Sequence, residues 1–333
     1  MRARAADLGV ALRPHLKTAK SIEVARATGA DAITVSTLRE AAFFLDHGVR
    51  DLTYAVGLDP AKIEACSALV RAGARLSVIT DDLGVAHALA RRGAGIDVLV
   101  EIDVGQHRGG VDPEGEELLA IASAVPVRGV LAHAGHSYGA ADVSAIRAIA
   151  EDERRLAVRA AQRLREAGHA IEVVSVGSTP TLVHAAHLEG VTEARAGVYT
   201  FFDRFQHALG SCGEDDLALT VLATVIGIRR HEGAILVDAG SLALSADRSM
   251  DGRGGGYGEA RDLADRPLEG RPRVTRVNQE HGWIDVGARV GSFSVGDRLR
   301  IRPNHACITA AMHAGYHVID GDQLAFWPRA NGW

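Results

Sequence analysis

The sequence of 333 residues has few cysteines, no long hydrophobic run and no block of like charges. Its three cysteines are odd in number and far apart, which argues against a disulfide framework. No apolar stretch is long enough to span a bilayer, and Met1–Asp7 lacks the apolar core of a signal peptide. The 37 basic and 42 acidic side chains are well mixed, so nothing indicates nucleic acid or a membrane surface as a partner. These absences predict a cytoplasmic location.

Up to about residue 200, the sequence alternates short β-branched runs with longer helical stretches rich in alanine and leucine. The expected strands are 11–17, 32–36, 52–56, 75–80, 97–103, 127–133, 171–178 and 193–199. Eight strands alternating with helices predict an α/β fold, a (β/α)8 TIM-type barrel. A doubly wound open sheet is the alternative, but a phosphate-binding Gly-x-Gly-x-x-Gly after the first strand is absent.

After Phe205 the pattern changes to strands joined by glycine-rich turns, without comparable helices between them. The expected strands are 217–229, 234–238, 273–278, 282–286, 297–301 and 317–319. We therefore assign a barrel to residues 1–205 and a mainly antiparallel β domain to residues 206–333. The glycine-rich stretch 251–258 is predicted to be a loop.

Lys17 follows a short apolar run, so it is expected where a buried strand reaches the surface of the barrel. Partial desolvation at such a position lowers the pKa of an amine and frees it to attack a carbonyl. A lysine of this kind forms a Schiff base with an aldehyde cofactor, most commonly pyridoxal phosphate. The alternative for a single lysine is a solvated position on a loop, so the remaining motifs decide between the two.

Other polar residues follow the ends of later strands, where barrels build their functional sites. The sixth strand leads into His133 and Tyr138, the seventh into Gly177–Pro180, and the eighth into Arg195–Tyr199. Barrels often bind phosphate in the loops after strands seven and eight, where backbone N–H groups face the anion. The hydroxyls of Gly177–Pro180 fit such a site, although Ser-Thr-Pro also forms ordinary helix caps.

His305 and Cys307 form a second candidate site in the predicted β domain. If this segment is extended, residues two apart point to the same face and could hold one metal ion. Imidazole with thiolate suits zinc best among the common divalent ions, and two protein ligands leave positions open for water or substrate. A core cysteine beside a hydrogen-bonded histidine is the alternative.

Together the motifs resemble those of the eukaryotic-type D-serine dehydratases and D-threonine aldolases. They comprise 13–18 (Arg-Pro-His-Leu-Lys-Thr), 132–138, 177–180 and 303–307. The resemblance covers nearly the whole chain, and residues 305–313 are closer to the dehydratases. It implies the alanine racemase fold, in which a pyridoxal-phosphate barrel precedes a β domain, and a homodimer. Relatives usually have a further strand and helix before Met1, so the barrel is expected to be shortened at its N-terminus.

The resemblance also implies which residues form the site. Lys17 would form the Schiff base and later act as base at the substrate Cα, while Arg108 would touch the phenolic oxygen of the cofactor. Tyr138 would lie near the pyridine nitrogen and His133 on the flank of the cofactor. The phosphate would be held by Gly177, Ser178, Thr179, Gly197 and Tyr199, and the metal by His305 and Cys307. The role of Arg195 is left open.

The implied activity is a lyase reaction on a small D-amino acid. Elimination of water and then ammonia from a D-3-hydroxy amino acid would give a 2-oxo acid. A divalent metal, expected to be zinc from the ligand types, would assist the departing hydroxyl. D-serine would give pyruvate, and D-threonine or a 3-hydroxyaspartate are further candidate substrates. The alternatives are retro-aldol cleavage to glycine and an aldehyde, racemisation, and binding of pyridoxal phosphate without catalysis.

Overall fold

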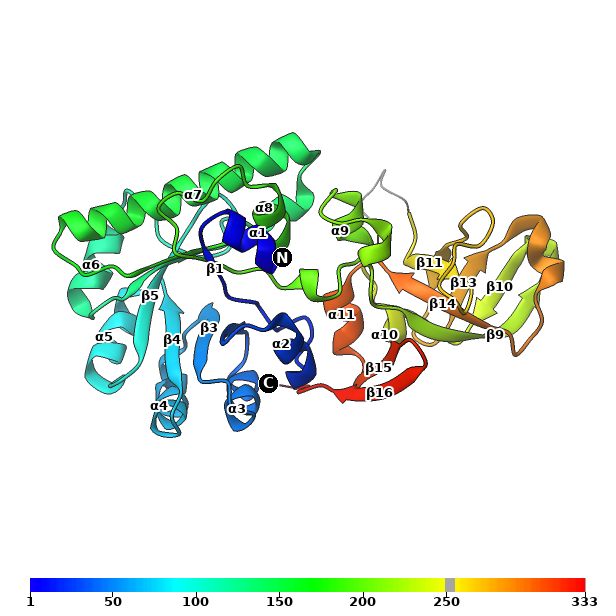
Figure 1. The fold of residues 1–333 in the computed structure, drawn as a ribbon, viewed down its shortest axis with the longest axis horizontal. Coiled ribbons are helices and arrows are strands. Elements are labelled where there is room, and N and C mark those ends of the chain that lie inside the picture. The colour runs from blue at the N-terminus through cyan, green and yellow to red at the C-terminus, as the bar shows by residue number, and fades with distance from the viewer. Residues whose placement is uncertain (249–254, 333) are drawn as a thin grey trace. The chain divides into compact units, whose positions relative to one another are not determined.

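The computed structural model describes residues 1–248 and 255–332 and contains two compact units (Figure 1). The first unit comprises Met1–Tyr199 and Trp327–Trp333, and the second comprises Thr200–Phe326. These units are not divided as the predicted domains 1–205 and 206–333 are, because the last residues of the chain belong to the first unit. The predicted domain boundaries stay a prediction. No helix among the described residues is long and apolar enough to cross a membrane.

The first unit is built on a parallel sheet of eight strands in the order β1-β8-β7-β6-β5-β4-β3-β2. These are β1 (Ala11–Leu12), β2 (Ala32–Val35), β3 (Asp51–Gly57), β4 (Arg75–Thr80), β5 (Asp97–Ile102), β6 (Gly129–Ala132), β7 (Val173–Val176) and β8 (Glu193–Ala194). A parallel bridge between His15 and Thr34 joins the segment after β1 to β2, which closes the sheet. The predicted barrel is confirmed. Its first strand is shorter than predicted, since Pro14 lacks the N–H that a continuous ladder needs.

Eight helices accompany the barrel strands within the described residues of the first unit. They are α1 (Arg2–Asp7), α2 (Ile22–Thr28), α3 (Leu38–Asp46), α4 (Ile63–Arg71), α5 (Leu83–Arg92), α6 (Glu116–Ala124), α7 (Val143–Glu166) and α8 (Thr179–His184). Thr37, Asp82 and Asp142 begin three of them, each accepting a hydrogen bond from the backbone N–H three residues later. These are the side chains that satisfy free donors at a helix start, so the helix starts are encoded locally.

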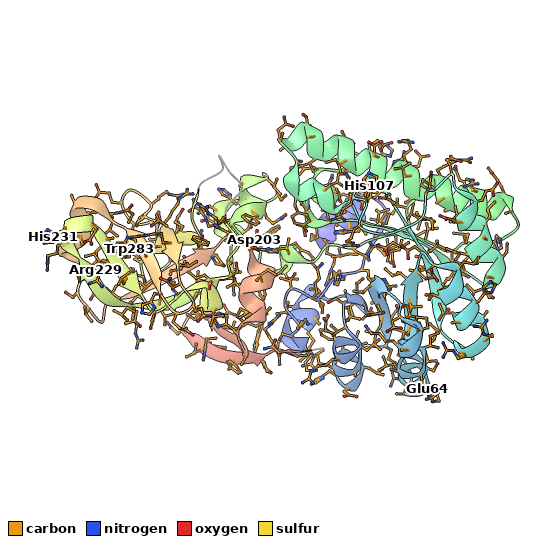
Figure 2. The ribbon with its side chains drawn as sticks, turned by 180° about the vertical axis from the view of Figure 1, so that it is seen from behind. Glu64, His107, Asp203, Arg229, His231 and Trp283 are labelled. Atoms are coloured by element: carbon orange, nitrogen blue, oxygen red, sulfur yellow. The ribbon has the colours of Figure 1, made fainter. Side chains whose placement is uncertain are left out.

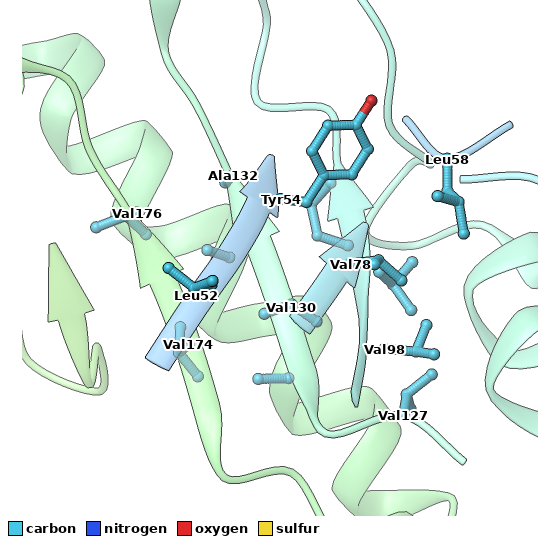
Figure 3. Close-up of a cluster of buried hydrophobic side chains, with 14 of the residues drawn as sticks. Leu52, Tyr54, Leu58, Val78, Val98, Val127, Val130, Ala132, Val174 and Val176 are labelled. Carbon is cyan, nitrogen blue, oxygen red and sulfur yellow. The ribbon is translucent and has the colours of Figure 1, made fainter. Parts of the chain in front are cut away.

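Successive apolar side chains of the barrel strands alternate between two clusters of buried hydrophobic residues. The larger cluster includes Leu52, Val78, Val98, Val130 and Val174 from five consecutive strands (Figure 3). The residues next to three of these, Ile79, Leu99 and Leu131, form a separate small cluster. Since neighbouring residues of a strand point to opposite faces, the second cluster fills the barrel interior and the first packs against the helices.

The second unit contains a six-stranded sheet in the order β11-β14-β9-β10-β13-β12, in which each neighbouring pair is antiparallel, and a two-stranded sheet, β15–β16. Its strands are β9 (Val221–Arg229), β10 (Ala234–Val237), β11 (Gly258–Arg261), β12 (Val274–Val277), β13 (Gly282–Asp285), β14 (Arg298–Pro303), β15 (Gly315–Asp320) and β16 (Gln323–Pro328). Three short helices are α9 (Arg204–Ala208), α10 (Ser241–Leu244) and α11 (Ala306–Ala311). The mainly antiparallel domain is confirmed.

Strand β11 was not predicted. Of the predicted loop 251–258, residues 251–254 lie outside the described residues, and Gly258 is the first residue of β11. The strand has no β-branched residue and carries Glu259 and Arg261, so its sequence does not look like a buried strand. It is buried because Arg261 and Arg204 each lie within 3 Å of the Glu259 carboxylate, and the charges are paired inside the unit.

Candidate functional site

The residues predicted to bind the cofactor all follow the C-terminal ends of barrel strands. They are Lys17 after β1, Arg108 after β5, His133 and Tyr138 after β6, Gly177, Ser178 and Thr179 after β7, and Gly197 and Tyr199 after β8. Parallel strands of a closed barrel end at the same face, so these residues share one end of the first unit. Lys17 is exposed there, whereas its neighbours Leu16 and Thr18 are fully buried. The individual roles of these residues stay predictions.

His133 is held in one orientation and is kept neutral. Its Nδ1 lies 3.0 Å from the carbonyl oxygen of Gly177, and since a carbonyl only accepts, Nδ1 carries the proton. Burial and the positive charges of Lys17, Arg195 and Arg108 lower the pKa of His133 to about 3, against the opposing effect of the Gly177 carbonyl. Nε2 of the neutral ring is therefore a hydrogen-bond acceptor at this end of the barrel.

The hydroxyl groups after β7 and β8 divide into two sets. Ser178 begins α8 with a capping box, and its Oγ lies 3.0 Å from Oγ1 of Thr181 and from Oγ of Ser137. Oγ1 of Thr179 and Oη of Tyr199 are buried and have no hydrogen-bond partner among the described residues. A buried hydroxyl without a partner costs free energy, so these two groups fit a ligand with acceptor oxygens, such as a phosphate.

At this end of the barrel, two glycines allow neighbouring backbone segments to approach each other closely. A Cβ on Gly197 would lie 2.7 Å from the carbonyl oxygen of His15, in the segment that leads to Lys17. Gly177 has φ of +124°, and a Cβ there would lie 2.8 Å from the carbonyl oxygen of Arg195. Any larger residue would push apart the segments after β1, β7 and β8, so both positions require glycine.

Arg195 supplies a fixed positive charge inside the barrel. Its guanidinium donates to Oγ of Ser175 at 2.5 Å and to the carbonyl of Ala132 at 2.6 Å, and it is almost fully buried. The Ser175 hydroxyl in turn donates to Glu193, which also accepts from Arg13 at 2.7 Å. Burial lowers the pKa of Arg195 to about 10, so it keeps its proton at neutral pH. The sequence left its role open, and the structure places it in this interior network.

Side-chain contacts also connect the loops after β4, β5 and β6. Asp81 accepts the backbone N–H of Gly110 at 2.7 Å, and Gln106 accepts that of Gly135 at 3.2 Å. Arg108 lies on the same β5 loop as His107 (Figure 2), and its guanidinium donates to Glu101 at 3.2 Å while remaining half exposed. The loops that carry the predicted cofactor residues are therefore held by side chains of their neighbours.

Glu153 is a residue of this site that the sequence analysis missed. It lies on α7, is 2 % exposed, and its Oε1 accepts the backbone N–H groups of Ala134 at 2.8 Å and Gly177 at 3.0 Å. One carboxylate oxygen thus joins the loop after β6 to the loop after β7. Burial raises the pKa of Glu153, although these hydrogen bonds oppose the shift. In the sequence, Glu153 is one of several acidic residues of a long helix. The one indication of its role is that it is a charged residue on the face of the helix that is otherwise apolar and buried.

We expect Glu153→Ala to destabilise the barrel by about 2 to 5 kcal/mol, because it leaves two buried N–H groups without an acceptor. Glu153→Gln keeps an oxygen at the same place and should cost less than half as much. Thermal unfolding of both variants measures the difference. The control is Asp152→Ala on the same helix, which removes an exposed pair with Arg155 and should stay within about 0.5 kcal/mol of the parent. Equal losses for alanine and glutamine would contradict the role of the shared oxygen.

The two predicted metal ligands lie together in the second unit. Nδ1 of His305 is 2.6 Å from Oδ2 of Asp247, and the thiol of Cys307 is hydrogen bonded to the His305 side chain. Burial opposes a charge on this ring, but the Cys307 thiol and the carboxylates of Asp203 and Asp247 raise the pKa of His305 to about 9. The pair is therefore an imidazole and a thiol in direct contact.

The extended conformation predicted for this pair is wrong. His305 is the N-cap of α11 and Cys307 lies in its first turn. The helix forms because Oδ2 of the buried Asp203 accepts the N–H of Ala306 at 2.9 Å, while Oδ1 accepts the N–H of Gln206 in α9 at 2.9 Å (Figure 2). Asp203 is thus a second residue that sequence analysis missed, and it anchors the segment that carries the pair.

The donor set fits a divalent metal with open coordination positions. The bond from Nδ1 to the Asp247 carboxylate leaves Nε2 as the ligand nitrogen, the carboxylate–histidine arrangement found at zinc sites. Nitrogen and sulfur donors favour zinc among common divalent ions. In the described ranges, no group of three or more histidine, cysteine, aspartate or glutamate side chains is placed to hold a metal. His305 and Cys307 would therefore supply two of the ligands.

Comparison with known proteins gives the family. The sequence-family model of the alanine racemase N-terminal domain matches residues 1–204, and that of the putative serine dehydratase domain matches residues 218–319. D-threo-3-hydroxyaspartate dehydratase of Delftia sp. is 43% identical over 98% of this chain and 91% of its own length. D-serine dehydratase of Dictyostelium discoideum is 32% identical over 97% of this chain and 89% of its own length.

The solved structure of the Delftia dehydratase has a TM-score of 0.95 with this chain at 43% sequence identity, covering 100% of this chain and 93% of that one. Solved forms of that enzyme include a histidine-to-alanine variant and a metal-free cysteine-to-alanine variant. The family predicted from the motifs is confirmed. The chain belongs to the D-serine dehydratase family of pyridoxal-phosphate-dependent lyases, which share the alanine racemase fold.

Proposed function

We propose that this protein is a pyridoxal-phosphate- and metal-dependent lyase that eliminates water from a D-3-hydroxy amino acid. The observation that carries the proposal is the set of groups at one end of the barrel. An exposed amine, Lys17, shares this end with two buried hydroxyls, Thr179 and Tyr199, that lack partners among the described residues. An amine with a nearby phosphate cradle is what binding of this cofactor requires.

The barrel residues have distinct roles in the proposal. When bound, pyridoxal phosphate would stabilise the negative charge left at the substrate Cα after its proton is removed. Lys17 binds the cofactor and its Nζ takes the Cα proton, while the hydroxyls of Thr179 and Tyr199 donate to the phosphate. His133 presents an unprotonated Nε2 on the flank of the site, because its Nδ1 proton is held by Gly177. Tyr138 and Arg108 contact the cofactor ring, and Gly177, Ser178 and Gly197 form the backbone around the phosphate.

A divalent metal, zinc by its donors, is held by His305 and Cys307. When bound, the metal would polarise the β-hydroxyl of the substrate. This assistance is needed because hydroxide is a poor leaving group at neutral pH. Support comes from the Delftia dehydratase, whose metal-free form carries a cysteine-to-alanine substitution. The histidine and cysteine replaced in the solved variants of that enzyme are separated by one residue, as His305 and Cys307 are. The elimination releases water, and hydrolysis of the resulting enamine or imine releases ammonia and a 2-oxo acid.

The proposed protein is a homodimer located in the cytoplasm.

The proposed substrates are small D-3-hydroxy amino acids. Two of the relatives are dehydratases of D-threo-3-hydroxyaspartate and D-serine, so these two compounds are the first substrates to test. Two arginines at this end of the barrel, the buried Arg195 and the half-exposed Arg108, supply positive charge that favours an anionic amino acid.

The proposal is tested by turnover of D- and L-3-hydroxy amino acids with protein loaded with zinc and pyridoxal phosphate. The panel contains serine, threonine and the threo and erythro forms of 3-hydroxyaspartate, with 2-oxo acid, ammonia and aldehyde measured in parallel. We expect 2-oxo acid and ammonia in equal amounts from D-substrates alone. Glycine with an aldehyde would instead identify the aldolase reaction, and conversion of D- to L-isomer would identify a racemase.

A further inference from the structure

The segment that carries Lys17 is a single buried turn. The N–H of Lys20 donates to the carbonyl of Leu16 at 2.7 Å, which closes a turn of the helical type. Leu16, Thr18 and Ala19 are fully buried, and Lys17 between them is exposed. Lys20 has φ of +47°, a left-handed conformation that a side chain rarely adopts, so the turn ends there. The direction in which Lys17 projects therefore depends on what holds this turn.

The carbonyl groups at the end of the turn are satisfied from the far end of the sequence. Nε of Arg329 donates to the carbonyl of Ala19 at 2.9 Å, and its Nη2 donates to that of Thr18 at 3.2 Å. The N–H of Ala330 donates to the carbonyl of Lys20 at 2.8 Å. These are three consecutive carbonyls, the groups that a terminated helical turn leaves without partners. Arg329 and Ala330 belong to the same compact unit as the turn.

Arg329 is itself fixed in place. It is 8 % exposed, and its Nη1 donates to Oδ1 of Asn331 at 2.9 Å. The planar guanidinium thus presents two donors to two adjacent carbonyls, a geometry that a lysine cannot reproduce. On its other side the turn is held by Lys20, whose Nζ lies 3.0 Å from the buried carboxylate of Glu40. Figure 1 shows the end of the chain reaching α2 and α3, which follow the turn.

We propose that Arg329 is a positioning residue for Lys17. By holding the carbonyls of Thr18 and Ala19, it fixes the turn from which the reacting amine projects. The inference rests on the proposed function of Lys17 as the cofactor-binding base. A displacement of about 1 Å of a reacting group can cost about 100-fold in rate, so a contact that holds the turn acts on catalysis without touching the substrate.

The first test measures the turn itself, in the cofactor-free protein. Arg329→Gln removes the paired donors, and Arg329→Lys keeps the charge but only one point of donation. The matched control is Arg165→Gln, because Arg165 also donates through two nitrogens to a backbone carbonyl, that of Ile171, before β7. We expect amide hydrogen exchange of residues 16–20 to rise about tenfold or more in Arg329→Gln, less in Arg329→Lys, and not at all in Arg165→Gln.

The second test measures the same three variants loaded with cofactor and metal. We expect kcat of Arg329→Gln to fall about 10- to 100-fold with KM changed less than about threefold, and Arg329→Lys to fall between it and the parent. Unchanged exchange and unchanged kcat in Arg329→Gln would overturn the inference. So would equal losses in Arg329→Gln and Arg165→Gln, since they would report general destabilisation. If the parent protein does not bind pyridoxal phosphate at Lys17, the proposed function fails, while the exchange experiment still decides whether Arg329 holds the turn.

Discussion

Lys17→Ala is expected to lower turnover at least about 1,000-fold and to remove the visible absorbance band of the bound cofactor. Nζ of Lys17 is an exposed primary amine in the turn after β1, between the buried Leu16 and Thr18. Alanine removes both the group that binds the cofactor and the base at Cα, so no smaller effect is compatible with the proposal. Absorbance spectra and single-turnover assays of the purified variant measure the two losses separately.

The control for this prediction is Lys20→Arg. Lys20 stands three residues away and is paired with Glu40 at 3.0 Å, and an arginine keeps that pair. We expect Lys20→Arg to retain the absorbance band and to change turnover by less than about fivefold, since arginine keeps the positive charge beside the buried Glu40 carboxylate. A Lys17→Ala protein that keeps the band would move the cofactor away from Lys17 and contradict the assignment of the whole barrel site.

His305→Ala and Cys307→Ala are each expected to remove the bound metal and to lower the elimination rate by about 100-fold or more. Each substitution takes away one of the two proposed protein ligands, and the remaining one would not hold a divalent ion alone. Metal content is measured by mass spectrometry of the purified protein, and activity by release of the 2-oxo acid. Treatment of the parent protein with a chelator should give the same loss, and zinc should restore it.

Asp247 offers a graded version of the metal experiment. Its Oδ2 lies 2.6 Å from Nδ1 of His305, so Asp247→Ala keeps both ligands but frees the ring to turn. Loss of such an orienting carboxylate should weaken zinc about 10- to 100-fold. His231→Ala, on an exposed turn of the same unit (Figure 2), should leave metal content unchanged. Full activity in metal-free protein would contradict the role proposed for His305 and Cys307.

The barrel was predictable because its signals are local. The strand predicted at 75–80 is β4 as observed, and the long helix α7 begins at the cap residue Asp142. Alternation of apolar residues and helix caps acts over a few neighbouring residues, and the sequence displays both directly. Lys17 and residues 177–180 were predicted as site residues from their places after strands, because barrel sites lie where strands end.

The parts that were missed depend on contacts between residues far apart in the sequence. Glu153 resembles any acidic residue of a long helix until the loops after β6 and β7 bring two N–H groups to it. The helix at Cys307 starts because Asp203, about a hundred residues earlier, caps it from another segment. Arg329 lies 310 residues from Ala19, whose carbonyl it binds. No periodicity within one segment encodes such contacts, since their free energy appears only when the segments meet.

The most direct test of the account uses the low number of lysines in this chain. Lys17, Lys20 and Lys62 are the only three in the sequence, so a label on one of them is assigned without ambiguity. The protein is loaded with pyridoxal phosphate, reduced with borohydride, digested and mapped by mass spectrometry. We predict one pyridoxyl-phosphate group per chain, attached to Lys17. Attachment to Lys20 or Lys62, or no attachment in protein that is folded and saturated with cofactor, would contradict the proposed active site.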